Sequence, residues 1–292
     1  MTERHLVGSA GPETLKACCA AAYETDAVAL LLGDSYHPGG LILTRRLARA
    51  LELRPGQVVL DVACGPGATA CLLAEEFGVH VDGVDLGTSS LARARARAAE
   101  RALDDRVRFH VGDAECLPFD DGVFDAVVSE CAFCTFPDKA TAAAEFARVL
   151  RPGGRVGITD VTLDRTRLNP GLATVAGSIA CLADARPASE YAALLADVGL
   201  AIVVSEPHDE ALAAMIDQIE NRLRALGIVA TEGVGFDLDT ILRYTAAAAR
   251  AVADGVAGYQ LMVVSRPAAK PTTTARTMPR RATGPGAASG GS

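Results

Sequence analysis

The chain has 292 residues, a net charge of −8 and 50% hydrophobic residues, which allow a large buried core and exclude a globally disordered chain. Its acidic balance argues against a nucleic-acid partner, because phosphate contacts need clustered Lys and Arg. No apolar run approaches the ~20 residues that span a bilayer, and the first ten residues lack a signal pattern, so we expect a cytoplasmic protein without membrane contact.

The first segment, residues 1–50, is predicted to be a helical lid with a break at residues 33–40. The break reads GDSYHPGG, and its Gly, Asp, Ser and Pro are typical of a loop. Tyr23 and Tyr36 are candidates to cover a bound ligand, and His37 is a candidate functional residue of the loop.

Residues 51–206 alternate between short apolar runs and helical sequence. Strands are expected over residues 58–62, 80–85, 106–113, 124–130, 154–161 and 201–206. Helices are expected over residues 68–77, 89–103, 139–150 and 188–199, and the RPGG of residues 151–154 is expected to end the third of these and turn the chain. This alternation predicts an α/β fold with a doubly wound, mostly parallel sheet.

Residues 207–257 are predicted to form a helical insertion before the last strand. Two amphipathic helices are expected there, over residues 209–226 and 237–254, either capping the strand ends or packing on the sheet edge. Residues 258–267 provide the last, seventh core strand. Residues 268–292 are rich in Pro, Thr, Gly, Ala and Ser and are predicted to be a disordered tail.

The stretch VLDVACGPGATA joins a strand, an acid and a Gly-rich turn to a helix. Gly65 and Gly67 would let the backbone approach a ligand at the start of that helix. Asp85 closes the next strand, where an acid can take ribose hydroxyls. Asp113 follows the third strand, where a carboxylate can reach an adenine amino group. An NAD dehydrogenase uses a similar turn, but it prefers Gly where this chain has Ala70.

With LRPGG before the fifth strand, these motifs resemble class I S-adenosylmethionine-dependent methyltransferases over about residues 55–205. The resemblance implies a Rossmann-like methyltransferase fold and S-adenosyl-L-methionine as the cofactor. It implies that Asp61 and the two turn glycines hold the methionine end of the cofactor, that Asp85 binds the ribose, and that Asp113 borders the adenine. The remaining residues expected against the cofactor are Ala63, Leu86, Ala114 and Glu130.

Two cysteines, Cys131 and Cys134, follow the fourth strand in SECAFCTFPDK. The end of that strand should face the transferred methyl group, because ligands bind beyond the carboxyl ends of parallel strands. The cysteines lack the spacing of a structural zinc site. With Cys181 from the connection after the fifth strand, they would suit trivalent arsenic, a soft acceptor that binds thiolates.

The segment from Ser129 to Val161 resembles the arsenite methyltransferase segment that carries an arsenic-binding cysteine, and Cys131 matches that cysteine. The segment GSIACLADARPASEYAALLADVGL resembles the second cysteine segment of the same family, with Cys181 as the match. The resemblance implies methylation of As(III) held by Cys131 and Cys181, with a small thiol as reductant. Cys134 is a further candidate ligand. A cysteine of the family is missing before the Gly-rich turn, and His37 or Ser35 would stand in for it, or Cys18 or Cys19 would reach the site instead.

Two alternatives stay open. The first is a small-molecule C-, O- or N-methyltransferase of secondary metabolism, in which the cysteines are structural and Asp160, His37 or Glu130 is the base. The second is a protein that binds the cofactor without turnover.

Overall fold

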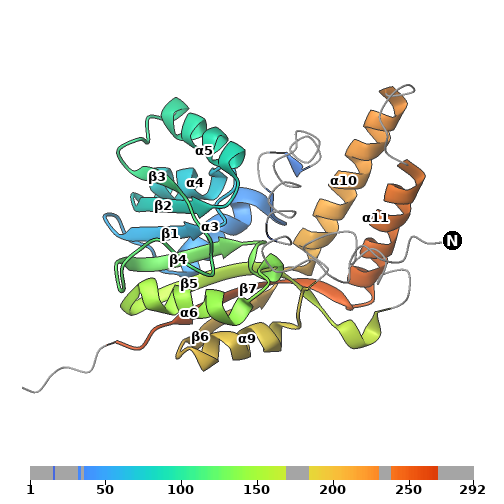
Figure 1. The fold of residues 1–292 in the computed structure, drawn as a ribbon. Coiled ribbons are helices and arrows are strands. Elements are labelled where there is room, and N and C mark those ends of the chain that lie inside the picture. Colours follow the sequence, from blue (N-terminus) through green and yellow to red (C-terminus); the bar gives the residue numbers. More distant parts are fainter. Residues whose placement is uncertain (1–15, 17–31, 34–35, 169–183, 230–237, 269–292) are drawn as a thin grey trace, which may run out of the picture.

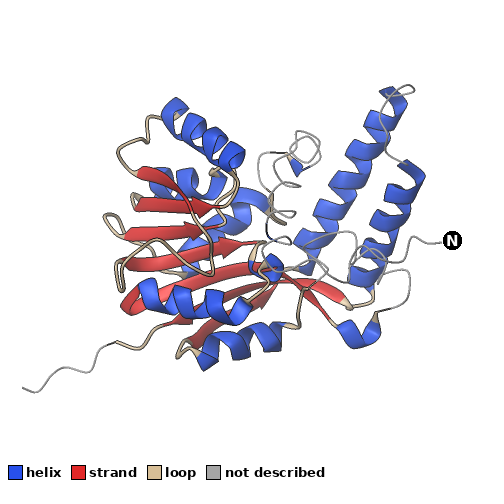
Figure 2. Cartoon of the chain, viewed as in Figure 1, coloured by secondary structure: helices blue, strands red, loops and turns tan. Residues whose placement is uncertain are grey.

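The computed structural model describes residues 16, 32–33, 36–168, 184–229 and 238–268. Its centre is a seven-stranded sheet in the order β3-β2-β1-β4-β5-β7-β6 (Figures 1 and 2). The strands are β1 Val58–Val62, β2 His80–Asp85, β3 Val107–Val111, β4 Phe124–Glu130, β5 Leu150–Leu163, β6 Ala201–Pro207 and β7 Ala257–Ser265. Only β7 runs antiparallel to its neighbours. The predicted seven-stranded, mostly parallel α/β sheet is confirmed.

Helices cover both faces of this sheet (Figure 1). The helices of the sheet layers are α3 Gly40–Ala50, α4 Ala68–Phe77, α5 Thr88–Glu100, α6 Lys139–Val149 and α9 Ala188–Asp197. The first three pack together on one face, and α6 and α9 pack together on the other. β1 lies inside the sheet between β2 and β4, and its residues Val59 and Leu60 are fully buried, as expected for a parallel strand covered on both sides.

The RPGG segment interrupts β5 instead of preceding it. Leu150 pairs with Phe124 of β4, whereas Arg155 pairs with Ala126, so the four residues between them are accommodated as an irregularity of the strand. Gly153 takes the left-handed backbone conformation there, with a φ of 83°. The predicted turn is present, but the predicted helix ends at Val149 and the strand begins directly after it.

Two longer helices, α10 Asp209–Val229 and α11 Leu238–Ala253, stand beyond the carboxyl ends of the parallel strands (Figure 1). They pack on each other and on β7, which follows them. A Cβ placed on Gly39, just before α3, would lie 3.4 Å from the Cβ of Ala211 on α10. The helical segment before the last strand therefore borders the chain that leads into α3.

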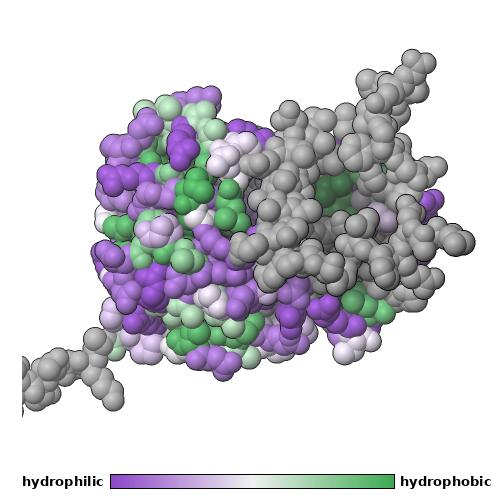
Figure 3. Space-filling model, in the orientation of Figure 1, coloured by the Kyte–Doolittle hydropathy of each residue, from purple (hydrophilic) through white to green (hydrophobic). Residues whose placement is uncertain are grey.

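Exposed large apolar side chains are scattered over the described part of the chain. They are Ile42, Leu86, Val111, Ile202 and Val203. On the face in Figure 3, hydrophobic patches are separated by hydrophilic side chains. Among the described helices, none is long and apolar enough to cross a membrane.

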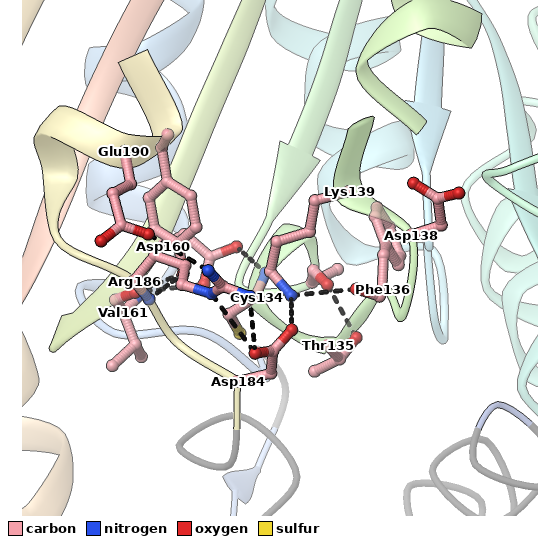
Figure 4. Close-up of polar contacts among 12 residues, drawn as sticks. Cys134, Thr135, Phe136, Asp138, Lys139, Asp160, Val161, Asp184, Arg186 and Glu190 are labelled. Carbon is pink, nitrogen blue, oxygen red and sulfur yellow. Dashed lines mark hydrogen bonds and ion pairs between the residues drawn. The ribbon is translucent and has the colours of Figure 1, made fainter. Parts of the chain in front are cut away.

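A buried lysine fastens the loop after β4 to the chain that leads into α9 (Figure 4). The side chain of Lys139, at the start of α6, is only 4% exposed. Its Nζ donates to the carbonyl oxygen of Phe136 at 2.9 Å and to Oδ2 of Asp184 at 2.6 Å. Burial opposes ionisation of Asp184, but Lys139 and Arg186 outweigh it and lower the pKa of this carboxyl. The contact fixes the loop relative to residues 184–186.

We predict that Gly67→Ala destabilises the fold. Gly67 has a φ of 75°, and an added Cβ would lie 2.8 Å from both the Cβ of Ala94 and the ring of Phe109. Steric overlap and left-handed strain should lower the free energy of unfolding by about 2–4 kcal/mol, measured by urea denaturation. Gly65→Ala is the control, because its added Cβ meets nothing within 4 Å; strain alone should cost about 1–2 kcal/mol. Equal losses would contradict the packing role of Gly67.

We predict that Lys139→Met lowers the free energy of unfolding by about 1–3 kcal/mol at neutral pH. Breaking a buried ion pair costs about 3–5 kcal/mol, and the value is reduced here because Asp184 is 35% exposed. Since folding lowers the pKa of Asp184, its contribution is full above the unfolded value of about 3.9 and is lost as the pH falls through the folded value.

Urea denaturation at neutral and acid pH tests this expectation. Because the contribution of Asp184 is lost in acid, the difference in the free energy of unfolding between Lys139→Met and wild type should shrink there. Arg224→Met, which removes an exposed pair with Glu220, should cost about 0.5 kcal/mol or less. An equally small loss of stability in Lys139→Met would contradict the stabilising role of the Lys139–Asp184 pair.

Candidate active site

A cavity opens at the carboxyl ends of β1, β2 and β4, beside the Gly-rich turn. The predicted site residues that line it are Tyr36, His37, Asp61, Ala63, Gly65, Asp85, Leu86, Asp113, Ala114, Glu130 and Cys131. The sequence therefore located 11 of the 23 residues that line the cavity, although these 11 are spread over almost 100 positions. Tyr23 and Cys181 lie outside the described residues.

Asp85 shapes the Gly-rich turn. Its Oδ2 accepts a hydrogen bond from the backbone N–H of Gly65 at 2.9 Å, and its Oδ1 accepts one from Gly87 at 2.7 Å. Because the space beside Gly65 is open, the turn presents backbone to the cavity. Gly67 does not line the cavity; its missing side chain leaves room for the close packing described above.

Asp61 is a buried acid at the end of β1, with 2% of its surface exposed. Its Oδ2 has no hydrogen-bond partner among the described residues. Burial, followed by the charges of Glu130 and Asp85, raises the pKa of Asp61 well above its usual range. A buried carboxylate oxygen with an unused lone pair suits a cationic ligand group, because such a group would relieve both the burial and the repulsion.

Glu130 ends β4, the strand next to β1, and its side chain is 4% exposed. Its Oε2 accepts hydrogen bonds from the hydroxyls of Thr44 at 2.9 Å and Thr69 at 2.6 Å. The Nε2 of His37 lies 3.5 Å from the same oxygen. The two threonines were not predicted from the sequence, and only Thr69 lies in a motif, two residues after Gly67.

Lys16 lines the cavity beside Asp113, and no local sequence pattern points to it. Its Nζ lies 2.6 Å from Oδ2 of Asp113 and 2.6 Å from Oε2 of Glu115. Burial opposes the charge of Lys16, but these two acids outweigh it and raise its pKa. Among the described residues that line the cavity, it is the one Lys or Arg.

Cys131 and Cys134 have different surroundings. Cys131 lines the cavity and holds a φ of 55°, a left-handed conformation that is strained for a residue with a side chain. Cys134 is fully buried and does not line the cavity; its backbone N–H donates to Oδ2 of Asp160 at 2.9 Å. The short helix η1, Phe133–Thr135, turns the second thiol into the core, so the structure does not support its expected role as a ligand.

Asp160, a candidate base, is also fully buried and is absent from the cavity wall. Its Oδ1 accepts from the backbone N–H of Val161 at 2.7 Å, in addition to the bond from Cys134. Its two bonds are structural, between β5 and the loop after β4. The described residues contain no group of three or more His, Cys, Asp or Glu side chains placed to hold a metal ion.

Comparison with curated proteins finds similarity to several methyltransferases. Methyltransferase GfsG of Streptomyces halstedii is 36% identical over 57% of this chain and 61% of its own length. The 27-O-demethylrifamycin SV methyltransferase of Amycolatopsis mediterranei is 40% identical over 41% of this chain and 44% of its own. The arsenite methyltransferase of Halobacterium salinarum is 33% identical over 54% and 41%. The chain thus spans less than two thirds of the length of these relatives.

Solved structures share the fold at low sequence identity. Phosphoethanolamine N-methyltransferase 2 of Haemonchus contortus, in complex with S-adenosyl-L-methionine, superposes with a TM-score of 0.74 and 21% identity, over 89% of this chain and 61% of that one. The cyclopropane synthase MmaA2 of Mycobacterium tuberculosis superposes with a TM-score of 0.73 and 19% identity, over 89% of this chain and 100% of that one.

A family model described as a methyltransferase domain matches residues 59–154. This match spans β1 to the first part of β5, the part of the chain that carries the Gly-rich turn, Asp85, Asp113 and Glu130. It agrees with the family that the sequence motifs indicate and with the strand order of the sheet. Residues 59–154 of this chain therefore carry the sequence pattern of a methyltransferase domain.

Proposed function

We propose that this chain is an S-adenosyl-L-methionine-dependent methyltransferase that acts on a small molecule. The observation that carries the proposal is the buried pair of acids, Asp61 and Glu130, which end neighbouring strands beside the Gly-rich turn. Asp61 has an unused buried oxygen, and the two acids repel each other. A ligand with positive charge fits this wall, and S-adenosyl-L-methionine carries an ammonium and a sulfonium.

The cavity wall offers separate groups for the parts of this cofactor. Asp61 and the backbone of the turn at Gly65 would hold its amino-acid end. Asp85 would take the ribose hydroxyls, and Asp113 and Ala114 would border the adenine. When bound, the cofactor supplies an electrophilic methyl group. The chain then has to orient an acceptor and keep water away, for which the apolar Phe136 and Pro137 of the wall are suited.

An organic acceptor is the first candidate. One predicted acceptor thiol, Cys131, lines the cavity among the described residues, whereas Cys134 faces the core. Arsenic(III) is bound in proteins by two or three thiolates. Cys64 also lines the described wall, with its thiol beside Gly83, so Cys131 would need a second thiol from that residue or from Cys181. The name of the relative that shares 40% identity, a 27-O-demethylrifamycin SV methyltransferase, supports an organic acceptor.

Arsenite is the second candidate acceptor, and two observations favour it. Cys131 is held in a strained conformation at the cavity wall, as functional residues often are. The Halobacterium relative is an arsenite methyltransferase. This reaction would draw its second thiol from Cys181 and use a small thiol as the reductant.

We predict that Asp85→Ala weakens S-adenosyl-L-methionine binding by about 1–3 kcal/mol, measured by isothermal titration calorimetry. The change removes hydrogen bonds to a charged group and releases the turn at Gly65. Asp82→Ala is the control, because Asp82 lies on the same strand and pairs with His110, away from the cavity. The control should bind as wild type does. Unchanged affinity in Asp85→Ala would show that the ribose site is misplaced.

We predict that the two acceptor classes separate in a turnover assay. The protein is incubated with S-adenosyl-L-methionine, arsenite and a small thiol, and separately with hydroxyl and amine acceptors; S-adenosylhomocysteine and the methylated product are followed together. An organic acceptor predicts a methylated organic product and no methylated arsenic. Methylated arsenic that disappears in Cys131→Ser, but not in the exposed control Cys116→Ser, would establish the arsenite reaction instead.

A further inference from the structure

His37 lies in the cavity wall next to a buried carboxylate and has polar neighbours at both ring nitrogens. It is 7% exposed. Its Nδ1 lies 3.3 Å from the carbonyl oxygen of Pro38. Its Nε2 lies 3.3 Å from the hydroxyl of Thr44 and 3.5 Å from Oε2 of Glu130. The hydroxyl of Thr44 also donates to Glu130, which ties the three side chains into one cluster.

The cluster can hold the neutral His37 ring and can accept a further proton. A neutral ring with its proton on Nδ1 would donate to the carbonyl oxygen of Pro38 and accept from the hydroxyl of Thr44 at Nε2. A proton added to Nε2 would face the hydroxyl of Thr44 and Oε2 of Glu130, and both of these oxygens can accept a hydrogen bond. Nε2 of His37 is therefore placed to take up a proton beside a carboxylate.

The buried acids of the wall also suit a positive charge at this place. Asp61 and Glu130 are buried at the ends of neighbouring strands, and the one Lys or Arg among the described wall residues, Lys16, is paired with Asp113 and Glu115. A sulfonium beside the two acids would neutralise part of their charge, and that positive charge disappears when the methyl group leaves. A proton taken up by His37 would restore it. The acids can thus stabilise one positive charge before and after the reaction.

We propose, resting on the methyltransferase function proposed above, that His37, backed by Glu130 and Thr44, accepts the proton that a hydroxyl or amine acceptor loses on methylation. The acceptor's lone pair forms the new bond to the methyl carbon, and the sulfur of the cofactor keeps the electron pair of the broken bond. The proton of the acceptor passes to His37. No oxidant or reductant is needed.

The same charges define the class of acceptor as uncharged or basic and protic. A phosphorylated acceptor would bring negative charge to a wall whose acids outnumber its single paired lysine. An arsenic acceptor attacks through a lone pair and has no proton to lose, so His37 would be dispensable for it.

The test compares the binding of S-adenosyl-L-methionine and S-adenosylhomocysteine, which differ in the sulfonium charge and methyl group. Protonated His37 should repel the sulfonium, so the ratio of their dissociation constants should rise about tenfold from about pH 8 to about pH 5.5, the effect of a one-unit coupling to an imidazole. Calorimetry in buffers of different ionisation enthalpy should show proton release on binding the first ligand and not the second. Both measurements are independent of the acceptor.

Variants identify the group responsible. The other titratable groups of the wall are Lys16, Tyr36, Asp61, Cys64, Asp85, Asp113 and Cys131. Asp61 is the main rival, because its protonation would weaken sulfonium binding in the same direction. His37→Gln should flatten the ratio, whereas Asp61→Asn should keep its rise. His110→Gln, which pairs with Asp82 away from the cavity, should behave as wild type.

Three outcomes would contradict the proposal. A wild-type ratio independent of pH, or an equal rise in His37→Gln, would remove His37 from the role while leaving the methyltransferase function intact. Equal proton release with both ligands would do the same, and this measurement needs only the wild-type protein. Failure of the wild-type protein to bind either ligand would instead overturn the proposed function itself.

Discussion

The repulsion between two buried acids, Asp61 and Glu130, is the constraint on which the site depends. Neighbouring parallel strands end at the same edge of the sheet, so the register of β1 and β4 brings the two carboxylates together at the cavity. Three threonine hydroxyls around Glu130 lessen the cost of burying it, but Asp61 keeps one oxygen without a partner in the described structure. An arrangement that costs folding energy and faces a cavity is one that a cationic ligand would stabilise.

The other elements of the site hold these two acids in place and leave the cavity beside them open to a ligand. Asp85 fixes the Gly-rich turn, and Gly67 allows α4 to pack closely against α5 and β3. Through Asp184, Lys139 ties the loop after β4 to the chain that leads into α9. The chain before α3, which carries His37, completes the wall beside α10. Stability of the fold and shape of the cavity therefore depend on the same few contacts.

The sequence predicted the features that have a local signature. The strands are apolar runs, and Gly65, Asp85 and Glu130 stand directly at their ends, so their position at the cavity follows from the fold class. Lys16 and Thr44 had no such signature, because Lys16 reaches the cavity and Thr44 reaches Glu130 from the N-terminal part of the chain. The sequence also does not predict which way the side chains point in the loop after β4. Cys134 lies in η1 and is buried in the core, whereas Cys131 lies in the cavity wall.

The most direct test of the proposed charge-compensated site is a crystal structure of the protein with S-adenosylhomocysteine. The proposed site predicts that the amino group of this ligand takes the unused oxygen of Asp61, and that its ribose takes the carboxylate of Asp85. A ligand bound away from the ends of β1 and β2, or one whose amino group leaves Asp61 without a partner, would contradict it.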